Sequence, residues 1–287
     1  MERAEVLGDQ IQNPSLEQVH FPKVVAVTSG KGGVGKTNVV ANLGVALSKL
    51  GKTVLVLDAA LGLGNLDVLF GVIPRYTIEH VLRGQKTLSE IMMQGPCGIQ
   101  ILPTSSGTED LIHLTSEQKL ILLGELDRLE KRVDVLLIDT AAGISSNVLY
   151  FNTVAQEIIV IASLEPTSVT DAYAIMKVLS IRHGEKRFKL LVNMVENERE
   201  AKEVFHKLTM VADQFLDIAI EYIDFIPQDD YLRMAVCQQK AVVDIYPKSR
   251  SSLQFIQLAR RVIQWPVIGI PKGNLQFLWK KLLLPEL

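Results

Sequence analysis

One eight-residue stretch, GKGGVGKT at residues 30–37, most constrains how this chain can fold. It follows the apolar run Val24–Val27 and opens a helical-length stretch, Lys36–Lys49, so the chain passes from strand to glycine-rich loop to helix. Glycines let such a loop curl so that its backbone N–H groups point inward, at the positive end of the helix dipole. The stretch therefore predicts a polyphosphate-binding loop.

The pattern GxxxxGK[ST] gives most residues of this loop a role. Lys36 would bridge the β- and γ-phosphates of a nucleotide, and the hydroxyl of Thr37 would ligate Mg²⁺. A plain glycine-rich turn is the alternative, but chance should produce this pattern in only about one in a hundred chains of this length. The other residues expected at the nucleotide are Gly32, Gly33, Val34, Gly35 and Asn38.

Short apolar runs alternate with helical-length stretches, which predicts a doubly wound α/β fold with a mostly parallel sheet. We expect one domain over 23–265, after a tail at 1–22 and before a linker and helix at 266–287. The expected strands are Val24–Val27, Val54–Leu57, Val133–Ile138, Glu157–Leu164, Lys189–Met194 and Ile218–Ile226, and the expected helices are Lys36–Lys49, Ser116–Arg128, Ser145–Ala155, Val169–His183, Glu198–Phe215, Asp229–Gln238 and Ser249–Trp265.

Composition excludes several other classes of protein. Of the 287 residues, 48% are apolar and 22% charged, which is typical of a globular chain rather than a disordered or coiled-coil one. The net charge of −2 gives no bulk attraction for nucleic acid. Cys97 and Cys237 are far apart, so neither a disulfide framework nor a CxxC zinc site is expected. No signal peptide or membrane-spanning run is apparent, and we expect a cytoplasmic protein.

Asp139 ends the apolar run Leu136–Ile138, and Gly143 follows closely. A carboxylate at the tip of a strand can hold Mg²⁺ through water, and the glycine can follow the γ-phosphate as a mobile switch. An ordinary strand-end aspartate in a turn is the alternative. Downstream of a phosphate loop, the magnesium role is favoured.

Lys31 is a second lysine in the loop, one residue after the first glycine, and an ordinary phosphate loop does not need it. With Gly32 and Gly33 it resembles the KGGxGK[ST] variant of the deviant Walker A ATPases, the family that includes MinD, ParA and the nitrogenase iron protein. The resemblance implies an ATP-bound homodimer in which Lys31 reaches the partner's phosphates. A solvated loop charge is the alternative.

The stretch Asp58–Asp67 resembles the first switch of this family, D-x-D-x-G-x-x-N-x-D, which implies that Asp58 helps to hold Mg²⁺. Ala60 stands where the family has the aspartate that positions the attacking water. A methyl group accepts no hydrogen bond, and the loss of such a group typically costs about 10²–10⁴ in rate. We therefore predict binding of ATP and Mg²⁺ with very slow hydrolysis. Because the residues around Ala60 all match the family pattern, a deliberate exchange of aspartate for alanine, made to trap the ATP-bound dimer, is favoured over natural loss of the aspartate.

The same resemblance implies contacts with the base and ribose. Glu165 matches a residue that reaches the partner's ribose, and Asn193 matches the adenine-reading asparagine. Pro227 and Asp229 match the second adenine contact. Helix capping by Glu165 and Asp229, and a strand-end turn at Asn193, are the alternatives.

The C-terminal segment has an apolar stripe at helical spacing. After the linker, such a segment is typical of a helix that lies on anionic lipid, although packing on its own domain is an equal alternative. Two copies in a dimer would bind a membrane better than one, by effective concentration. The stripe consists of Leu275, Leu278, Trp279 and Leu282.

Asp9 and Gln10 lie on a tail that resembles the activator motif of the flagellar-number regulators FlhG, FleN and YlxH. That resemblance extends over nearly the whole chain, including Ser106–Thr108, Glu165–Tyr173 and Pro271–Leu275. It implies control of flagellar number and placement from the inner face of the cell membrane at the pole. The implied partners are an FlhF-type GTPase, a transcriptional activator of the FleQ/FlrA type and C-ring proteins.

Other members of the family remain alternatives. A division-site MinD would share every nucleotide residue, but the tail before Lys23 argues against it. A ParA-type partition protein would bind DNA, and the near-neutral charge indicates no basic surface. An iron–sulfur reductase would need cysteine ligands, and neither cysteine lies in such a motif. A phosphate-loop kinase is possible in principle, but no second-substrate motif is apparent.

Overall fold

The computed structural model describes residues 22–59, 66–76, 80–81, 83–103, 121, 125, 129 and 133–266. The helix expected at Ser116–Arg128 lies almost entirely outside these residues. The predictions for Asp9, Gln10, Ala60, Leu275, Leu278, Trp279 and Leu282 also lie outside them.

The described strands form one eight-stranded sheet in the order β3-β4-β2-β5-β1-β6-β7-β8. All neighbouring strands are parallel except β3 and β4, so the predicted doubly wound, mostly parallel sheet is confirmed. The strands are β1 (Lys23–Ser29), β2 (Val54–Ala59), β3 (Met93–Gln94), β4 (Gln100–Pro103), β5 (Val135–Ala142), β6 (Glu157–Ala162), β7 (Arg187–Val195) and β8 (Ala219–Pro227).

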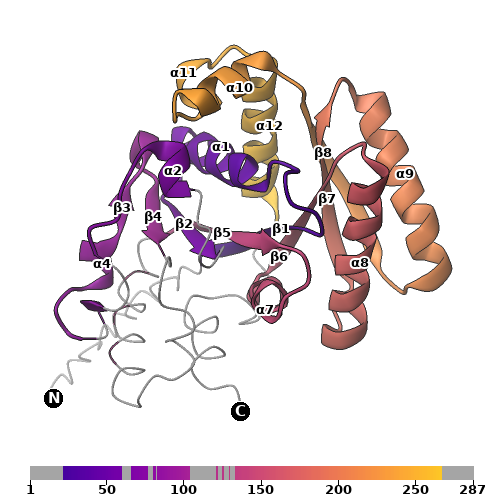
Figure 1. Ribbon diagram of the computed structural model, residues 1–287, viewed down its shortest axis with the longest axis horizontal. Helices are drawn as coiled ribbons and strands as arrows, with labels where there is room; N and C mark the ends of the chain where they lie inside the picture. The colour runs from indigo at the N-terminus through magenta and orange to yellow at the C-terminus, as the bar shows by residue number, and fades with distance from the viewer. Residues whose placement is uncertain are drawn as a thin grey trace, which may run out of the picture.

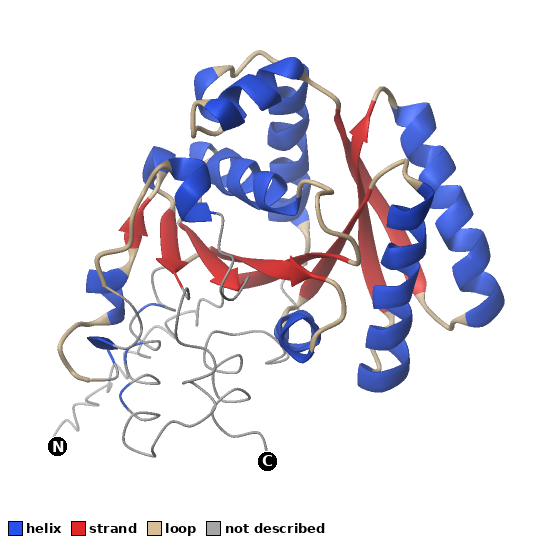
Figure 2. Cartoon of the chain, in the orientation of Figure 1, coloured by secondary structure: helices blue, strands red, loops and turns tan. Residues whose placement is uncertain are grey.

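Helices cover both faces of the sheet (Figures 1 and 2). One layer contains α1, α10, α11 and α12, and the other contains α7, α8 and α9. The chain forms a single domain with a core on each side of the sheet. The helices are α1 (Lys36–Lys49), α2 (Leu66–Phe70), α4 (Leu88–Ile91), α7 (Ser146–Val154), α8 (Pro166–His183), α9 (Glu198–Phe215), α10 (Asp230–Cys237), α11 (Val242–Ile245) and α12 (Arg250–Gln264), with a short 3₁₀ turn at Pro96–Gly98.

Strand β1 is buried along its whole length, which explains its continuous apolar sequence. Val25 and Val27 pack in the core beneath α1 and α12, whereas Val24 and Ala26 pack in the core on the opposite face. Successive side chains of a strand point to opposite faces, so a strand between two helical layers must be apolar at every position. The phosphate loop therefore starts from the centre of the sheet.

Several boundaries differ from the sequence prediction for local reasons. The strand expected to run to Leu164 ends at Ala162, because the Ser163 N–H donates to the Ser168 hydroxyl at 2.9 Å and turns the chain. Helix α8 begins at Pro166, three residues before the predicted start, since proline is well accommodated in the first turn of a helix. The short helices α2, α4 and α11, the edge strand β3 and its neighbour β4 were not predicted.

Lys23 fixes the end of α12 beside the start of β1. Its ammonium donates to the carbonyl oxygens of Val262 at 2.6 Å, Ile263 at 3.1 Å and Trp265 at 2.6 Å. Burial lowers the pKa of Lys23, and the three carbonyl oxygens compensate for its burial by accepting hydrogen bonds from the ammonium. The Lys189 ammonium lies 4.4 Å from the centre of the Trp265 ring and adds a cation–π contact.

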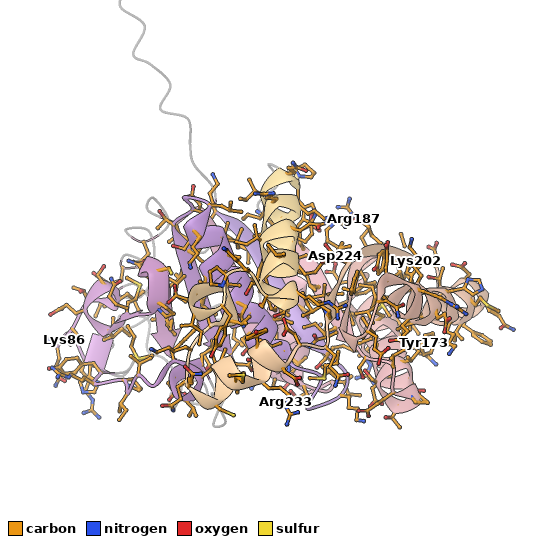
Figure 3. The ribbon with its side chains drawn as sticks, turned by 90° about the horizontal axis from the view of Figure 1, so that it is seen from above. Lys86, Tyr173, Arg187, Lys202, Asp224 and Arg233 are labelled. Carbon is orange, nitrogen blue, oxygen red and sulfur yellow. The ribbon has the colours of Figure 1, made fainter. Side chains whose placement is uncertain are left out.

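Charges of both signs are spread over the outer surface. Seen from above, nitrogen- and oxygen-tipped side chains interleave, and the labelled Lys202 and Arg233 lie on different helices (Figure 3). This mixture agrees with the net charge of −2.

Candidate nucleotide-binding site

The loop between β1 and α1 leaves the first turn of α1 open to a ligand. Gly33 and Gly35 have φ angles of 81° and 84°, a left-handed conformation that glycine adopts without strain. Gly35 is the N-cap residue of α1, so no side chain caps the helix, and no acidic residue lies in its first turn. The unpaired backbone N–H groups and the positive end of the helix dipole together form an anion site.

Two close contacts place the loop against helix α8 and strand β7. A Cβ atom on Gly30 would lie 2.0 Å from the carbonyl oxygen of Asp171, and one on Gly35 would lie 2.4 Å from Nδ2 of Asn193. The Asn193 side chain is 2% exposed and donates from Nδ2 to the carbonyl oxygen of Val34 at 2.7 Å. In the single chain Asn193 therefore positions the phosphate loop. Its contact with adenine stays a prediction.

The predicted magnesium residues Asp58 and Asp139 lie on adjacent strands beside the loop. They are direct partners in the register of β2 and β5, so their side chains lie on the same face of the sheet. Asp139 is 1% exposed, and neither of its carboxylate oxygens has a hydrogen-bond partner within the described part of the chain. A buried, unsatisfied carboxylate needs an explanation, and a hydrated cation would provide one.

This arrangement suits Mg²⁺ bound together with phosphates better than a closed metal site. No group of three or more His, Cys, Asp or Glu side chains that could hold a metal occurs among the described residues. Mg²⁺ usually takes one or two carboxylates and completes its shell with water and phosphate oxygens. The hydroxyl of Thr37, at the start of α1, is the further protein ligand that the sequence predicts.

Without a ligand, the site is electrostatically costly. Burial, with a smaller contribution from the Asp58 carboxylate, raises the pKa of Asp139 to about 7, against the opposing effects of Lys36 and the Thr37 hydroxyl. Burial also lowers the pKa of Lys36, although Asp139 partly restores it. The site therefore holds charged groups that a bound nucleotide and cation would compensate.

Asp139→Asn is expected to stabilise the ligand-free protein at pH 8. The pKa of Asp139 is about 7 in the folded chain and 3.8 ordinarily. As the pH rises, the unfolded chain therefore loses this proton before the folded chain does. The free energy of unfolding therefore falls as pH rises from about 4 to 7, by on the order of 2–4 kcal/mol. Urea titrations in EDTA at pH 5 and pH 8 would measure this, with the exposed Asp213→Asn as control. Equal pH dependence in Asp139→Asn and the parent chain would contradict it.

Lys31 and Glu165, which the sequence assigns to contacts with a partner chain, meet each other in the single chain. The Lys31 ammonium donates to the carboxylate of Glu165 and to the hydroxyl oxygen of Thr167, the latter at 2.9 Å. The Lys31 side chain is 33% exposed and that of Glu165 is 65% exposed. Both groups are thus accessible at the open side of the phosphate loop. The role of Thr167 was not predictable from the sequence, because a threonine in the first turn of a helix carries no distinctive signal.

Asp229 has the capping role that the sequence left open. Its carboxylate accepts hydrogen bonds from the Tyr231 N–H at 2.9 Å and from the N–H and hydroxyl of Ser251 at 2.9 and 2.7 Å. Burial acts to raise the pKa of Asp229, but these hydrogen bonds lower it overall. The carboxylate thereby joins the starts of α10 and α12, directly after Pro227 at the end of β8. An adenine contact at this turn stays a prediction.

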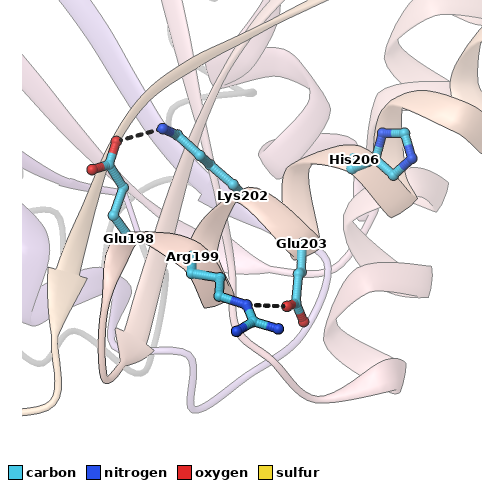
Figure 4. Close-up of a pocket in the computed structure, with 5 residues that line it drawn as sticks. All are labelled: Glu198, Arg199, Lys202, Glu203 and His206. Carbon is cyan, nitrogen blue, oxygen red and sulfur yellow. Dashed lines mark hydrogen bonds and ion pairs between the residues drawn. The ribbon is translucent and has the colours of Figure 1, made fainter.

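A hollow on the surface of α9 is not a competing site. Its charged residues pair along the helix, Glu198 with Lys202 at 3.0 Å and Arg199 with Glu203 at 3.3 Å (Figure 4). Pairs spaced by four residues are ordinary features of a solvated helix face. His206 completes the lining.

Comparison with known proteins agrees with the geometry of the loop. The model of the CobQ/CobB/MinD/ParA nucleotide binding domain matches residues 25–242. The chain is 44% identical over 267 residues to the antiactivator FleN of Pseudomonas aeruginosa, which covers 93% of this chain and 95% of that protein. It is 32% identical over 279 residues to the flagellum site-determining protein YlxH of Helicobacter pylori, covering 95% and 94%.

A solved structure has the same fold with a nucleotide bound. The septum site-determining protein MinD of Pyrococcus horikoshii, complexed with Mg-ADP, matches with a TM-score of 0.65 and 26% identity, over 84% of this chain and 96% of that one. No described helix is both long and apolar enough to cross a membrane. The resemblance predicted from the sequence is confirmed: the chain belongs to the CobQ/CobB/MinD/ParA nucleotide-binding family, among the relatives of FleN and YlxH.

Proposed function

We propose that this chain is an ATP-dependent dimerisation switch that controls flagellar number and placement. The position of Lys31 supports this most directly, because its ammonium lies at the open side of the phosphate loop, beside Glu165. Lys36, by contrast, is largely buried near Asp139, as expected of a lysine that serves the nucleotide of its own chain. The names of two relatives, an antiactivator and a flagellum site-determining protein, support the regulatory output.

The nucleotide would bind with its phosphates at the start of α1. The uncapped N–H groups of α1 would receive the phosphate oxygens, and Lys36 would contact the β- and γ-phosphates. Mg²⁺ would be held by Thr37, Asp58 and Asp139, and would supply positive charge beside the phosphates. Burial of Asp139 keeps bulk water from this side of the site. ATP, rather than ADP, adds the γ-phosphate that the partner's Lys31 would contact.

Hydrolysis is proposed to be slow because Ala60 cannot orient the attacking water. The chain would then remain for long periods in the ATP-bound dimer. The family supports ATPase chemistry in general, and the expected impairment is specific to this residue.

The output would depend on partners that recognise the dimer. A transcriptional activator of the FleQ/FlrA type is the partner that the relative's description as an antiactivator supports. We further propose an FlhF-type GTPase bound through Asp9 and Gln10, and C-ring proteins. The stripe at Leu275–Leu282 would attach the dimer to anionic lipid on the inner face of the membrane at the pole.

The molar mass in solution tests this function. Sedimentation with Mg²⁺ and either ADP or ATP should give a single chain with ADP and a doubled mass with ATP. Lys36→Gln, which removes the phosphate-binding ammonium, should stay a single chain in both. A mass that is the same with both nucleotides would contradict the switch.

A further inference from the structure

We propose that Met194 is an oxidation site beside the phosphate loop, where conversion of its thioether to a sulfoxide weakens nucleotide binding. A hydroperoxide is the class of oxidant that this site would take. The effect needs only the nucleotide site of the proposed function and not the association of two chains. Met194 would thereby make nucleotide binding sensitive to oxidants.

The backbone of Met194 has a conformation that normally favours glycine. Its φ angle is 60°, and among the described residues only Cys97 and Gln239 share a positive φ without being glycine. In this left-handed region the Cβ atom crowds the following carbonyl oxygen, which costs free energy. Glycine would avoid that cost. A long side chain kept at a strained position beside a ligand site points to a use for the side chain itself.

A bulge at the end of β7 accompanies this conformation. On β8, Ile226 is the partner of Asn193 and Pro227 is the partner of Val195, so Met194 is the extra residue between two successive pairs. Bulges commonly re-aim a side chain beside an active site. Here the bulge lies directly after Asn193, the residue that the sequence assigns to the adenine base.

The Met194 side chain reaches the phosphate loop. A Cβ atom on Gly35 would lie 3.3 Å from its terminal methyl carbon, Cε. Gly35 is the N-cap residue of α1, directly before the N–H groups that form the anion site. Asn193 links the two segments, because its Nδ2 donates to the Val34 carbonyl oxygen at 2.7 Å and its Oδ1 accepts from the Met194 N–H at 2.9 Å. The thioether is therefore held close to the start of α1, where the phosphates would bind.

The thioether is also accessible to oxidants, since Met194 is 47% exposed. Hydrogen peroxide would transfer one oxygen atom to the sulfur: the O–O bond breaks, an S–O bond forms, the sulfur loses two electrons and the peroxide is reduced to water. The product is polar and chiral, whereas the thioether is apolar. A thioether packs favourably on an aromatic ring such as adenine. Loss of that contact should weaken ADP binding by roughly two- to tenfold.

Titration calorimetry of the full chain with ADP and Mg²⁺, before and after treatment with hydrogen peroxide, tests this proposal. A thiol reductant added after the peroxide reverses disulfides and sulfenic acids at Cys97 and Cys237 but leaves a methionine sulfoxide in place. Each chain is compared with itself before treatment. The dissociation constant should rise by roughly two- to tenfold in the parent, and it should not rise in Met194→Leu, which has no sulfur at this position.

Met210→Leu is the matched control for this experiment. Met210 lies near the end of α9 and is 59% exposed, so its oxidation should not affect the nucleotide site. Met210→Leu retains Met194 and should lose affinity on oxidation as the parent does. An unchanged dissociation constant in the oxidised parent, or an equal rise in oxidised Met194→Leu, would overturn the proposal.

A second measurement needs no variant. Peroxide should oxidise Met194 several-fold more slowly when ADP and Mg²⁺ are bound, because the nucleotide would cover the thioether. Met210 should be oxidised at the same rate with and without ADP. Mass spectrometry of the peptides gives both rates, and equal oxidation of Met194 in the two conditions would overturn the proposal.

The outcomes distinguish this proposal from the proposed function. If the untreated parent binds no ADP, both fail. If the parent binds ADP and oxidation leaves the dissociation constant unchanged, only the role of Met194 fails. The molar mass with ADP and ATP then still decides whether the chain is a dimerisation switch.

Discussion

Ala60→Asp is expected to raise the rate of single-turnover ATP hydrolysis by about 10²–10⁴. The new carboxylate would stand in the first switch, where the family places the group that orients the attacking water. A carboxylate accepts a hydrogen bond from that water, and the methyl group of alanine cannot. The measurement is the release of labelled phosphate from enzyme in excess over ATP, with Mg²⁺, so that product release does not limit the rate.

Ala60→Asn provides the matched control for this experiment. Asparagine has nearly the same size and can accept a hydrogen bond, but it cannot take a proton, so its rate should stay well below that of Ala60→Asp. The ATP-bound dimer should also be shorter-lived in Ala60→Asp than in the parent. Equal hydrolysis rates in Ala60→Asp and the parent chain would show that this position does not limit the reaction.

Lys31→Ala should weaken ATP-dependent association by on the order of 10²–10⁴-fold. A dimer holds two copies of Lys31, so the substitution removes two charge-assisted contacts with phosphate at once. Loss of the ion pair between Lys31 and Glu165 within one chain should change this little, because both side chains are partly exposed. The apparent dissociation constant of the dimer, from sedimentation with ATP and Mg²⁺, measures the net result.

Nucleotide binding by the single chain separates this effect from damage to the loop. Lys31→Ala should bind ADP nearly as the parent does, because Lys36 and the start of α1 are unchanged. Lys207→Ala removes one exposed lysine on α9 and should leave association unchanged. Association of Lys31→Ala at the parental concentration would remove the basis of the proposed switch.

The parts of the fold that the sequence predicted best have strong local signals. Helix α1 begins at Lys36 and ends at Lys49, as predicted, because a glycine loop precedes it and a glycine follows it. Helix α9 also has its predicted bounds, with Asn197 accepting a hydrogen bond from Glu200 N–H at its start. The phosphate loop itself follows from residue identity, since few other arrangements need those glycines and lysines at that spacing.

The features that were not predictable depend on contacts between distant segments. The raised pKa of Asp139 arises from the packing that buries it, which no local pattern encodes. The contact of Lys31 with Thr167 requires the turn after β6 to lie against the loop after β1. The elements that went unpredicted are two to five residues long, too short for periodicity to distinguish strand from helix.

The Lys23 ammonium lies 2.6 Å from the Trp265 carbonyl oxygen, so positions 23 and 265, the predicted bounds of the domain, are separated by about the length of one lysine side chain. A short peptide joining position 265 to position 23 would therefore bridge only a small gap. Circular permutation of the domain is then feasible, with new ends opened in a surface turn such as the one between α9 and β8. Such a permuted chain would let the phosphate loop be studied apart from both natural extensions.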